Sequence, residues 1–525
     1  MLGKKWYKKL IFYFVALVVA VMPVLAGLSC GGTAKSGGVL KVIRAGTSDV
    51  TRIGYPAEGY QPGVGMYLYC AIESLVFIDK EGEVVPHLAT GWEITDGGKV
   101  YTFTLEEGVK FHDGTDFNAA AVKYNWELFI AEESTWFQNV TSIEVIDEYT
   151  VRITFSTPEA LFMNSLSYNM TGAMISPTAH ADNGSEWCGG NPVGTGPFKY
   201  VSKTPDVSLI YEKNDDYWMP GKPLVDGIEF YIYPEVATAT AAYLNGDADV
   251  LKGFASASVN TILEQSPTTQ LNLTAGLLYG WAFDSVHEDS PYSDVRVRRA
   301  MAYALDREAI VELAGGGLGV PTDQYCNPAH PAYNSNLDPQ YPYDPDMAIE
   351  LLEEAGYPNG FTTTITPQTS SPTHLSVMMA TAMADYYADV GITATVESLD
   401  TAQFREYRDN GWTNGLLITH ISSDVGSEPW TSLQKYWGDD RYRYTAMEDP
   451  PAMTGLLNLI PNTVDPTVRQ ALLWEVQRVL IEEECSFIPM ITYPDPVLYA
   501  DYVKDMDMSW FNPGHWSTWN VYKET

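Results

Sequence analysis

The sequence is poor in basic residues: 31 Lys and Arg stand against 67 Asp and Glu, which gives the 525-residue chain a formal net charge of −36. Phosphate binding needs a cationic face, so this balance argues against nucleic acid as a partner. Only five cysteines are present, and no two of them have the CxxC spacing of a zinc or redox motif. The GxSxG, Walker, HExxH and strand-linked GxGxxG motifs are missing as well. We therefore expect a protein that is not an enzyme and that holds no cofactor or metal.

What the chain does have is the composition of a large globular protein. Hydrophobic residues make up 45% and charged residues 19%, which excludes a disordered, collagen-like or coiled-coil chain. Single hydrophobic cores stop growing beyond about 250–300 residues, so this length predicts two or three lobes. Aromatic residues reach 13%, which is more than a core alone needs.

The N-terminus has the features of an export signal. Four lysines precede an apolar run at 10–28, the order typical of a secretory signal peptide. Cys30 follows this run and resembles the lipid-attachment cysteine of a bacterial lipoprotein, although Gly27 stands where that pattern prefers Leu. We expect a signal peptide at 1–29, a lipidated cysteine with a flexible tether at 30–38, and anchoring at the outer face of the cell membrane. A retained anchor helix and plain cleavage are the alternatives.

The rest of the chain has no second run of eighteen apolar residues, so it is not a membrane domain. Its cysteines are Cys70, Cys188, Cys326 and Cys485. An extracellular location permits disulfides, and four cysteines allow three pairings among which the sequence does not choose.

Strand and helix patterns alternate along the chain. Residues 39–44 predict an opening strand, and residues 100–105 and 149–155 alternate apolar and polar side chains as half-buried strands do. Asn118 is expected to cap a helix whose apolar residues recur at i, i+4 and i+7. This alternation predicts mixed α/β architecture.

The later half contains a predicted helix followed by a βαβ unit. Asp344 is expected to cap a helix that buries Ile349, Leu351 and Leu352 and ends at Gly356. Residues 361–396 then predict strand, helix and strand, and two strands joined in this way should be parallel with a right-handed crossover.

Several sequence blocks occur as a set. They are VPHLATGWE at 85–93, YTFTL at 101–105, GVKFHDGT at 108–115, NPVGTGPF at 191–198, NDDYW at 214–218, DVRVRRA at 294–300 and EAGYP at 354–358. Together they resemble the extracellular solute-binding proteins of family 5, the dipeptide- and oligopeptide-binding components of ABC importers. The blocks follow the family's order over about residues 38–510, which makes the set specific.

The resemblance implies an α/β, periplasmic-binding-protein-like fold of the large cluster C type, with three lobes and a hinged ligand cleft. Ligand would be enclosed between lobes I and III by domain closure and delivered by a monomeric receptor to ABC permease subunits in the membrane. The implied boundaries are 39–75, 194–284 and 489–525 for lobe I, 76–193 for lobe II and 285–488 for lobe III.

The resemblance also implies an acceptor for a peptide's amino group. In peptide-binding members an aspartate in a loop of lobe III pairs with the ligand's α-ammonium, and Asp424, beside Ser423, matches it. A buried ammonium needs such a charge-assisted acceptor. Peptide binders usually carry Trp where this chain has Ile421, so a metal chelate, a glycoside or another small organic solute is the alternative cargo. A loop aspartate that caps its own turn is the alternative role for Asp424.

The remaining candidates are residues of segments that match ligand-contacting parts of the family. For the aromatic ones, ordinary core packing is the alternative. A secreted hydrolase, for which no motif is present, and a module that binds a sensor protein are further alternatives. The candidates are Tyr279, Trp281 and Phe283 in the segment that crosses between lobes, Gln61 and Met66 in a first-lobe loop, and Trp136 and Trp430.

Overall fold

The computed structural model describes residues 37–46, 52–58, 64–79, 82–168, 170–253, 258–315, 317–326, 332–337, 340–368, 375–421, 430–438, 444–506, 508 and 516–524. All of them belong to one unit, Ser36–Thr525. The predicted signal peptide and Cys30 lie outside the described residues. Among the described helices, none has the length and apolar character needed to span a membrane.

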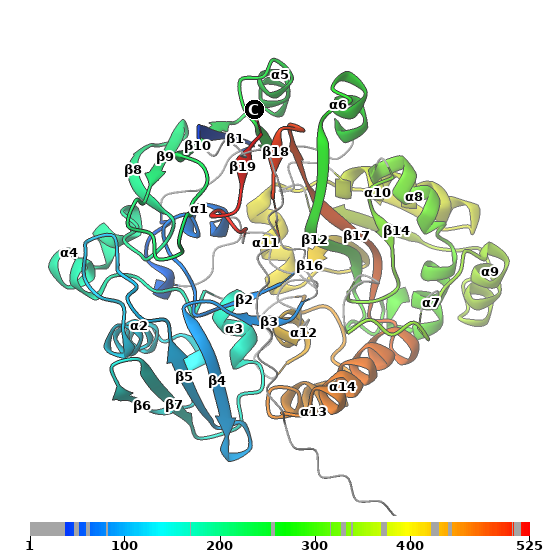
Figure 1. The fold of residues 1–525 in the computed structure, drawn as a ribbon. Coiled ribbons are helices and arrows are strands. Elements are labelled where there is room, and N and C mark those ends of the chain that lie inside the picture. The colour runs from blue at the N-terminus through cyan, green and yellow to red at the C-terminus, as the bar shows by residue number, and fades with distance from the viewer. Residues whose placement is uncertain are drawn as a thin grey trace, which may run out of the picture. The chain divides into compact units, whose positions relative to one another are not determined.

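One eleven-stranded sheet forms the centre of the fold (Figure 1). Its strand order is β15-β14-β16-β12-β17-β11-β1-β10-β9-β8, with β13 paired to β17. The strands are β1 Val39–Ala45, β8 Phe198–Thr204, β9 Ser208–Lys213, β10 Gly227–Tyr233, β11 Val250–Lys252, β12 Gln270–Phe283, β13 Val320–Pro321, β14 Thr362–Pro367, β15 Thr393–Val396, β16 Gly415–Ile421 and β17 Phe487–Tyr499.

Three smaller sheets accompany it. A four-stranded antiparallel sheet has the order β4-β5-β7-β6, and two further pairs are β2-β3 and β18-β19. These strands are β2 Val76–Ile78, β3 Val84–Pro86, β4 Ala89–Thr95, β5 Val100–Leu105, β6 Val140–Asp147, β7 Thr150–Phe155, β18 Val503–Lys504 and β19 Tyr522–Lys523.

Helices connect most of the strands. They are α1 Gly65–Leu68, α2 Ala119–Ala131, α3 Phe162–Tyr168, α4 Pro177–Gly190, α5 Val236–Leu244, α6 Val259–Gln265, α7 Val295–Tyr303, α8 Arg307–Gly315, α9 Pro345–Glu354, α10 Leu375–Asp389, α11 Thr401–Asn410, α12 Trp430–Trp437, α13 Met453–Leu459 and α14 Pro466–Arg478.

Two large hydrophobic cores lie on either side of the central strands. One gathers buried residues from β12 to the start of β17, including Leu278 and Tyr493. The other gathers residues from β1 to β11 together with the C-terminal segment, including Leu40 and Trp516. Since β12 and β17 pair along most of their length, these two strands carry the chain from one core to the other (Figure 1).

The predicted helix at Asn118 is confirmed. Helix α2 begins after Asn118, whose side-chain oxygen accepts a hydrogen bond from the Ala121 amide at 3.1 Å. The βαβ prediction is confirmed as well, because β14 and β15 flank α10 and pair in parallel.

The helix predicted at Asp344 is confirmed, and of its three predicted buried residues Leu352 is buried, Leu351 is partly buried and Ile349 is not. Asp344 caps α9 through a 3.0 Å hydrogen bond from the Met347 amide. Ile349 is exposed, while Ala348 and Leu352 are buried. These two residues are spaced i, i+4 and share the face that packs on the neighbouring helix α7, so Ile349 points to solvent.

Candidate ligand-binding site

Strands β1 and β11 of the central sheet end near the place where β12 and β17 run from one hydrophobic core to the other. Strand β1 pairs in parallel with β10 on one side and with β11 on the other. Strands β1 and β11 stop at Ala45 and Lys252, whereas β12 and β17 continue toward the second core. In open α/β sheets ligands bind outside the carboxyl ends of parallel strands, and here β11 ends beside the crossing strand β17, with which it pairs.

The crossing strands are irregular at this point. The register between β12 and β17 shifts between Thr274 and Leu277 and again between Tyr279 and Gly280. On β17, Asp495 lies between two prolines, and its carbonyl accepts a 3.0 Å hydrogen bond from the Thr274 hydroxyl. Bulges and prolines remove ladder hydrogen bonds, so the pairing of β12 with β17 is interrupted at this point.

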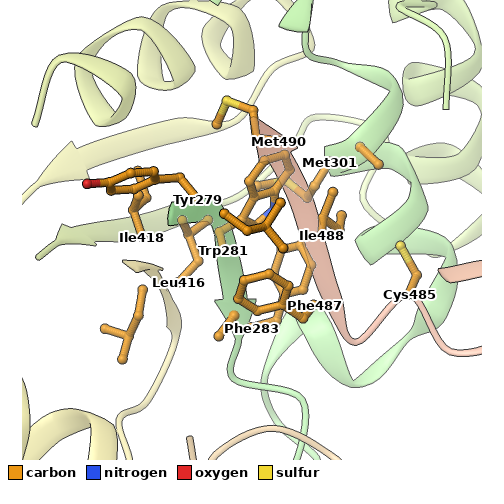
Figure 2. Packing of buried hydrophobic residues seen from close by; sticks show 14 of the residues in the cluster. Tyr279, Trp281, Phe283, Met301, Leu416, Ile418, Cys485, Phe487, Ile488 and Met490 are labelled. Atoms are coloured by element: carbon orange, nitrogen blue, oxygen red, sulfur yellow. The ribbon is translucent and has the colours of Figure 1, made fainter. Parts of the chain in front are cut away.

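The structure places the aromatic residues of the crossing segment in the core. Tyr279, Trp281 and Phe283 on β12 have exposures of 2%, 0% and 0%. They pack in the cluster shown in Figure 2, together with Leu416 and Phe487 among others. Core packing, the alternative that the sequence left open, describes their present environment, and contact with a ligand remains a prediction for them.

Two of these side chains have different neighbours. Figure 2 shows Tyr279 extending toward Ile418, while Trp281 extends toward Met301 and Ile488. At the register shift after Tyr279 the extra residue is Met490 on β17, because Tyr279 pairs with Ile491 and Gly280 with Pro489. The buried indole Nε1 of Trp281 has no hydrogen-bond partner within the described part of the chain.

Three other candidates have structural contacts. Met66 is 4% exposed, and its carbonyl accepts a 3.1 Å hydrogen bond from the Trp516 indole. Trp430 donates its indole N–H to the Leu457 carbonyl at 2.7 Å. Trp136 is partly buried and packs against both large cores. The structure therefore brings Trp136, but not Met66 or Trp430, to the junction of the two cores.

The polar candidates Asp424, Ser423 and Gln61 lie outside the described residues. Their expected ligand contacts therefore stay predictions. No three His, Cys, Asp or Glu side chains gather into a metal-binding group within the described ranges.

Two cations lie near the ends of the neighbouring strands β1 and β11. Arg44 on β1 and Lys252 on β11 are partners in register, and such partners project to the same face of a sheet. Lys252 is 5% exposed, and its Nζ lies 3.2 Å from Asp495 Oδ2 on β17. Arg44 is half-buried. Gly253 leaves room for the Arg44 guanidinium, because a Cβ at Gly253 would collide with it.

The electrostatics of this pair are unfavourable. Burial lowers the pKa of Lys252, Asp495 acts in the opposite direction, and the neighbouring charge of Arg44 lowers that pKa further. A signal in the sequence could have identified both residues: each is a basic residue at the end of an apolar strand, followed at once or after one residue by glycine.

The comparisons with known proteins agree with the fold. The family model "Bacterial extracellular solute-binding proteins, family 5 Middle" matches residues 83–444. The glutathione-binding proteins GsiB of Escherichia coli K12 and Shigella flexneri are each 30% identical to the chain over 460 residues, covering 84% of this chain and 86% of theirs.

Solved structures are similar over almost the whole chain. The periplasmic binding protein DppA of Helicobacter pylori, in complex with the peptide STSA, has a TM-score of 0.75 and 25% identity, covering 94% of this chain and 99% of its own. The binding protein AgaA of A. tumefaciens R10, in complex with agropinic acid, has a TM-score of 0.74 and 25% identity, covering 93% and 99%.

Proposed function

The chain belongs to family 5 of the bacterial extracellular solute-binding proteins, the solute receptors of ABC importers, and on that premise we propose that it captures short peptides. In this family-level role the protein binds a solute outside the cytoplasm and delivers it to a permease, without catalysis. The peptide would be held in the crevice beside β12 and β17, and bending of these strands would close the two cores around it.

The ligands named for similar proteins support a peptide as the cargo. The two GsiB relatives are named as glutathione-binding proteins, and glutathione is a tripeptide. The DppA structure holds a tetrapeptide. The two cores joined by two irregular strands suit a cleft that closes over a short ligand.

A second cargo class has support of its own. AgaA holds agropinic acid, a non-peptide solute, at the same identity as the peptide complex. Ile421, which stands where peptide binders usually carry Trp, favours this alternative.

The two classes separate in a thermal-shift and calorimetric screen of the purified chain. Panels of di- to pentapeptides, sugar acids, glycosides and metal chelates would be compared. A ligand that binds only the native state stabilises it by about 2.7 kcal/mol at one hundred times its Kd. We expect peptides to raise the melting temperature. A rise with a chelate or sugar derivative, and none with any peptide, would replace peptides by that class.

Asp424 is proposed to accept the ligand's α-ammonium. Asp424→Asn should weaken binding of a peptide with a free amino terminus by about tenfold or more, because a charge-assisted hydrogen bond is lost. The N-acetylated form of the same peptide should be unaffected by the change. The control Asp385→Asn removes the same charge from an exposed position on α10. Equal affinity of wild type and Asp424→Asn for the free peptide would remove this role.

Lipid attachment at Cys30 is proposed to hold the receptor at the membrane. The apolar run at 10–28 and the small residues around Cys30 support this. Cys30→Ser should shift the protein from the membrane fraction to the soluble fraction of cells. An unchanged distribution would favour a retained anchor helix instead.

A further inference from the structure

A cavity of about 360 Å³ lies beside the strands β14 and β16 and the end of helix α11. Gly415, the first residue of β16, lines it. Asp424, the residue predicted to hold the peptide, follows the other end of the same strand at Ile421. The cavity is therefore a second place for a small molecule, separate from the predicted peptide contact.

Two threonine hydroxyls of β14 belong to the lining of this cavity. Thr364 and Thr366 are two residues apart, so their side chains share one face of the strand. Thr366 is 3% exposed, yet its hydroxyl has no hydrogen-bond partner among the residues that the structure describes. On the opposite face the Thr363 hydroxyl is paired with the Tyr292 hydroxyl at 2.6 Å. Since buried polar groups are normally hydrogen-bonded, Thr366 lacks a partner that a ligand in the cavity would supply.

One wall of the cavity is held in place by a buried carboxylate. Asp284 is 0% exposed, and its two oxygens accept hydrogen bonds from His287 Nδ1 at 2.6 Å and from the Asn414 amide at 2.7 Å. The Trp412 indole donates to the Gly415 carbonyl at 3.0 Å. These bonds fix the turn between α11 and β16 and occupy Nδ1 of His287, so the Nε2 nitrogen of that ring is the one left for a ligand.

The other polar side chains of the lining have unused hydrogen-bonding capacity. Glu397 and Asn410 are exposed, and neither side chain has a hydrogen bond or ion pair within the described ranges. Tyr407 is 38% exposed and adds an aromatic ring. Threonine hydroxyls and the asparagine amide both donate and accept, whereas an ammonium only donates and a carboxylate only accepts. A ligand rich in hydroxyl groups can therefore satisfy more of this lining than an amine or an acid can.

We infer that this cavity binds an uncharged polyol of monosaccharide size. The hydroxyls of Thr364 and Thr366 would exchange hydrogen bonds with the ligand's hydroxyls, and the Glu397 carboxylate would accept two of their protons. The Tyr407 ring would cover the apolar C–H face of the sugar. The volume lies in the range of small-molecule sites, about 300–1,000 Å³. The inference goes beyond the proposed function, because it needs neither a peptide cargo nor Asp424.

Calorimetric titration of the purified full-length chain with glucose, galactose, mannose, ribose and myo-inositol tests this site. At least one of them should bind with a Kd of about 1 mM or lower. Thr366→Val keeps the shape of the side chain without its hydroxyl, and Glu397→Gln removes the charge from an exposed position. Each should weaken binding by about fivefold or more, since a hydrogen bond to the ligand is lost. Peptide affinity should stay the same in both variants, which also shows that they are folded.

Two matched controls remove the same groups outside the cavity. Thr393→Val lies at an exposed position of the neighbouring strand β15, and Glu406→Gln lies at an exposed position of α11. Both should leave the affinity for the sugar unchanged. The inference is overturned if none of the five compounds binds, or if binding survives both Thr366→Val and Glu397→Gln.

Failure of the proposed function has a different signature. If no peptide binds while a sugar binds and is weakened by both cavity variants, peptides are rejected as cargo and the polyol site is retained. If a sugar competes with peptides and is insensitive to the cavity variants, it occupies the main cleft, and the polyol site is rejected.

Discussion

Glu73 is the most heavily hydrogen-bonded buried carboxylate in the described part of the chain. It is 1% exposed and accepts hydrogen bonds from His87 at 2.8 Å and Thr195 at 2.7 Å. Tyr217 and the Trp218 indole donate to it at 2.5 and 3.0 Å. Burial alone would raise the pKa of Glu73, but the charge of His87 and these donors outweigh it, and the pKa is lowered from its ordinary value of 4.5.

Glu73→Gln should lower the free energy of unfolding at neutral pH by about 2–4 kcal/mol, because an amide turns N–H groups toward donors that need an acceptor. A carboxyl whose pKa is lowered in the folded state contributes stability above its unfolded value near 4.5. That contribution is lost as the pH falls through the folded pKa. The difference between wild type and variant should therefore shrink below about pH 4.5 in urea titrations.

The control for this prediction is Asp116→Asn. Asp116 accepts a 2.6 Å hydrogen bond from Lys110, but both side chains are exposed, so the unfolding midpoint should stay the same. A Glu73→Gln variant as stable as the wild type at neutral pH, or one whose deficit does not depend on pH, would contradict the account of this network.

At the scale of elements, the start of a helix depends on local contacts, whereas the crossing strands depend on long-range pairing. Helix α9 begins where the Asp344 side chain accepts the Met347 amide, a contact that spans three residues and needs nothing from the rest of the fold. The crossing strands β12 and β17 instead pair residues far apart in the sequence, such as Leu278 with Thr492. The first is a property of a short segment, and the second exists only in the folded sheet.

Asp344→Ala should weaken the start of α9 by about 1 kcal/mol, because the Met347 amide loses its acceptor. Hydrogen exchange of that amide should become about fivefold faster. Asp344→Asn keeps a capping oxygen and should exchange nearly as slowly as the wild type. Equal exchange in the alanine variant and the wild type would show that the cap does not limit opening of this helix.

At the scale of the whole molecule, four thiols are distributed through the cores. Cys70, Cys188, Cys326 and Cys485 are all free and buried, so no disulfide among them contributes to stability. Burial raises the pKa of Cys188 and of Cys485 to about 11, which keeps these thiols protonated and unreactive at neutral pH.

A thiol-reactive reagent should accordingly label none of these four cysteines in the native chain and all four after unfolding. A fifth thiol should titrate only if Cys30 is unmodified, so the count also reports on lipid attachment. Added reductant should not change the unfolding midpoint. A count of three or fewer in the unfolded, non-reduced chain would demonstrate a disulfide and contradict the structure.

The sequence predicted only some of the residues of the candidate site. Tyr279, Trp281 and Phe283 were found because the crossing segment matches the family, but their burial on β12 depends on which strands pair with it. Arg44 and Lys252 each end an apolar strand near a glycine, but nothing in either segment shows that the two strands are neighbours. Their adjacency comes from the parallel pairing of β1 with β11, across more than two hundred residues of chain.

The sequence by itself determined the helix caps at Asn118 and Asp344, the strand and helix periods, the βαβ unit and the family, because each depends on side chains a few residues apart or on blocks in a fixed order. The tertiary structure alone decided which distant charges meet. Glu73 and Trp218 are 145 positions apart, and Lys252 and Asp495, which form an ion pair, belong to the paired strands β11 and β17, more than two hundred positions apart in the chain. Such contacts depend on strand pairing and on the burial it imposes, and no local pattern of the sequence encodes either.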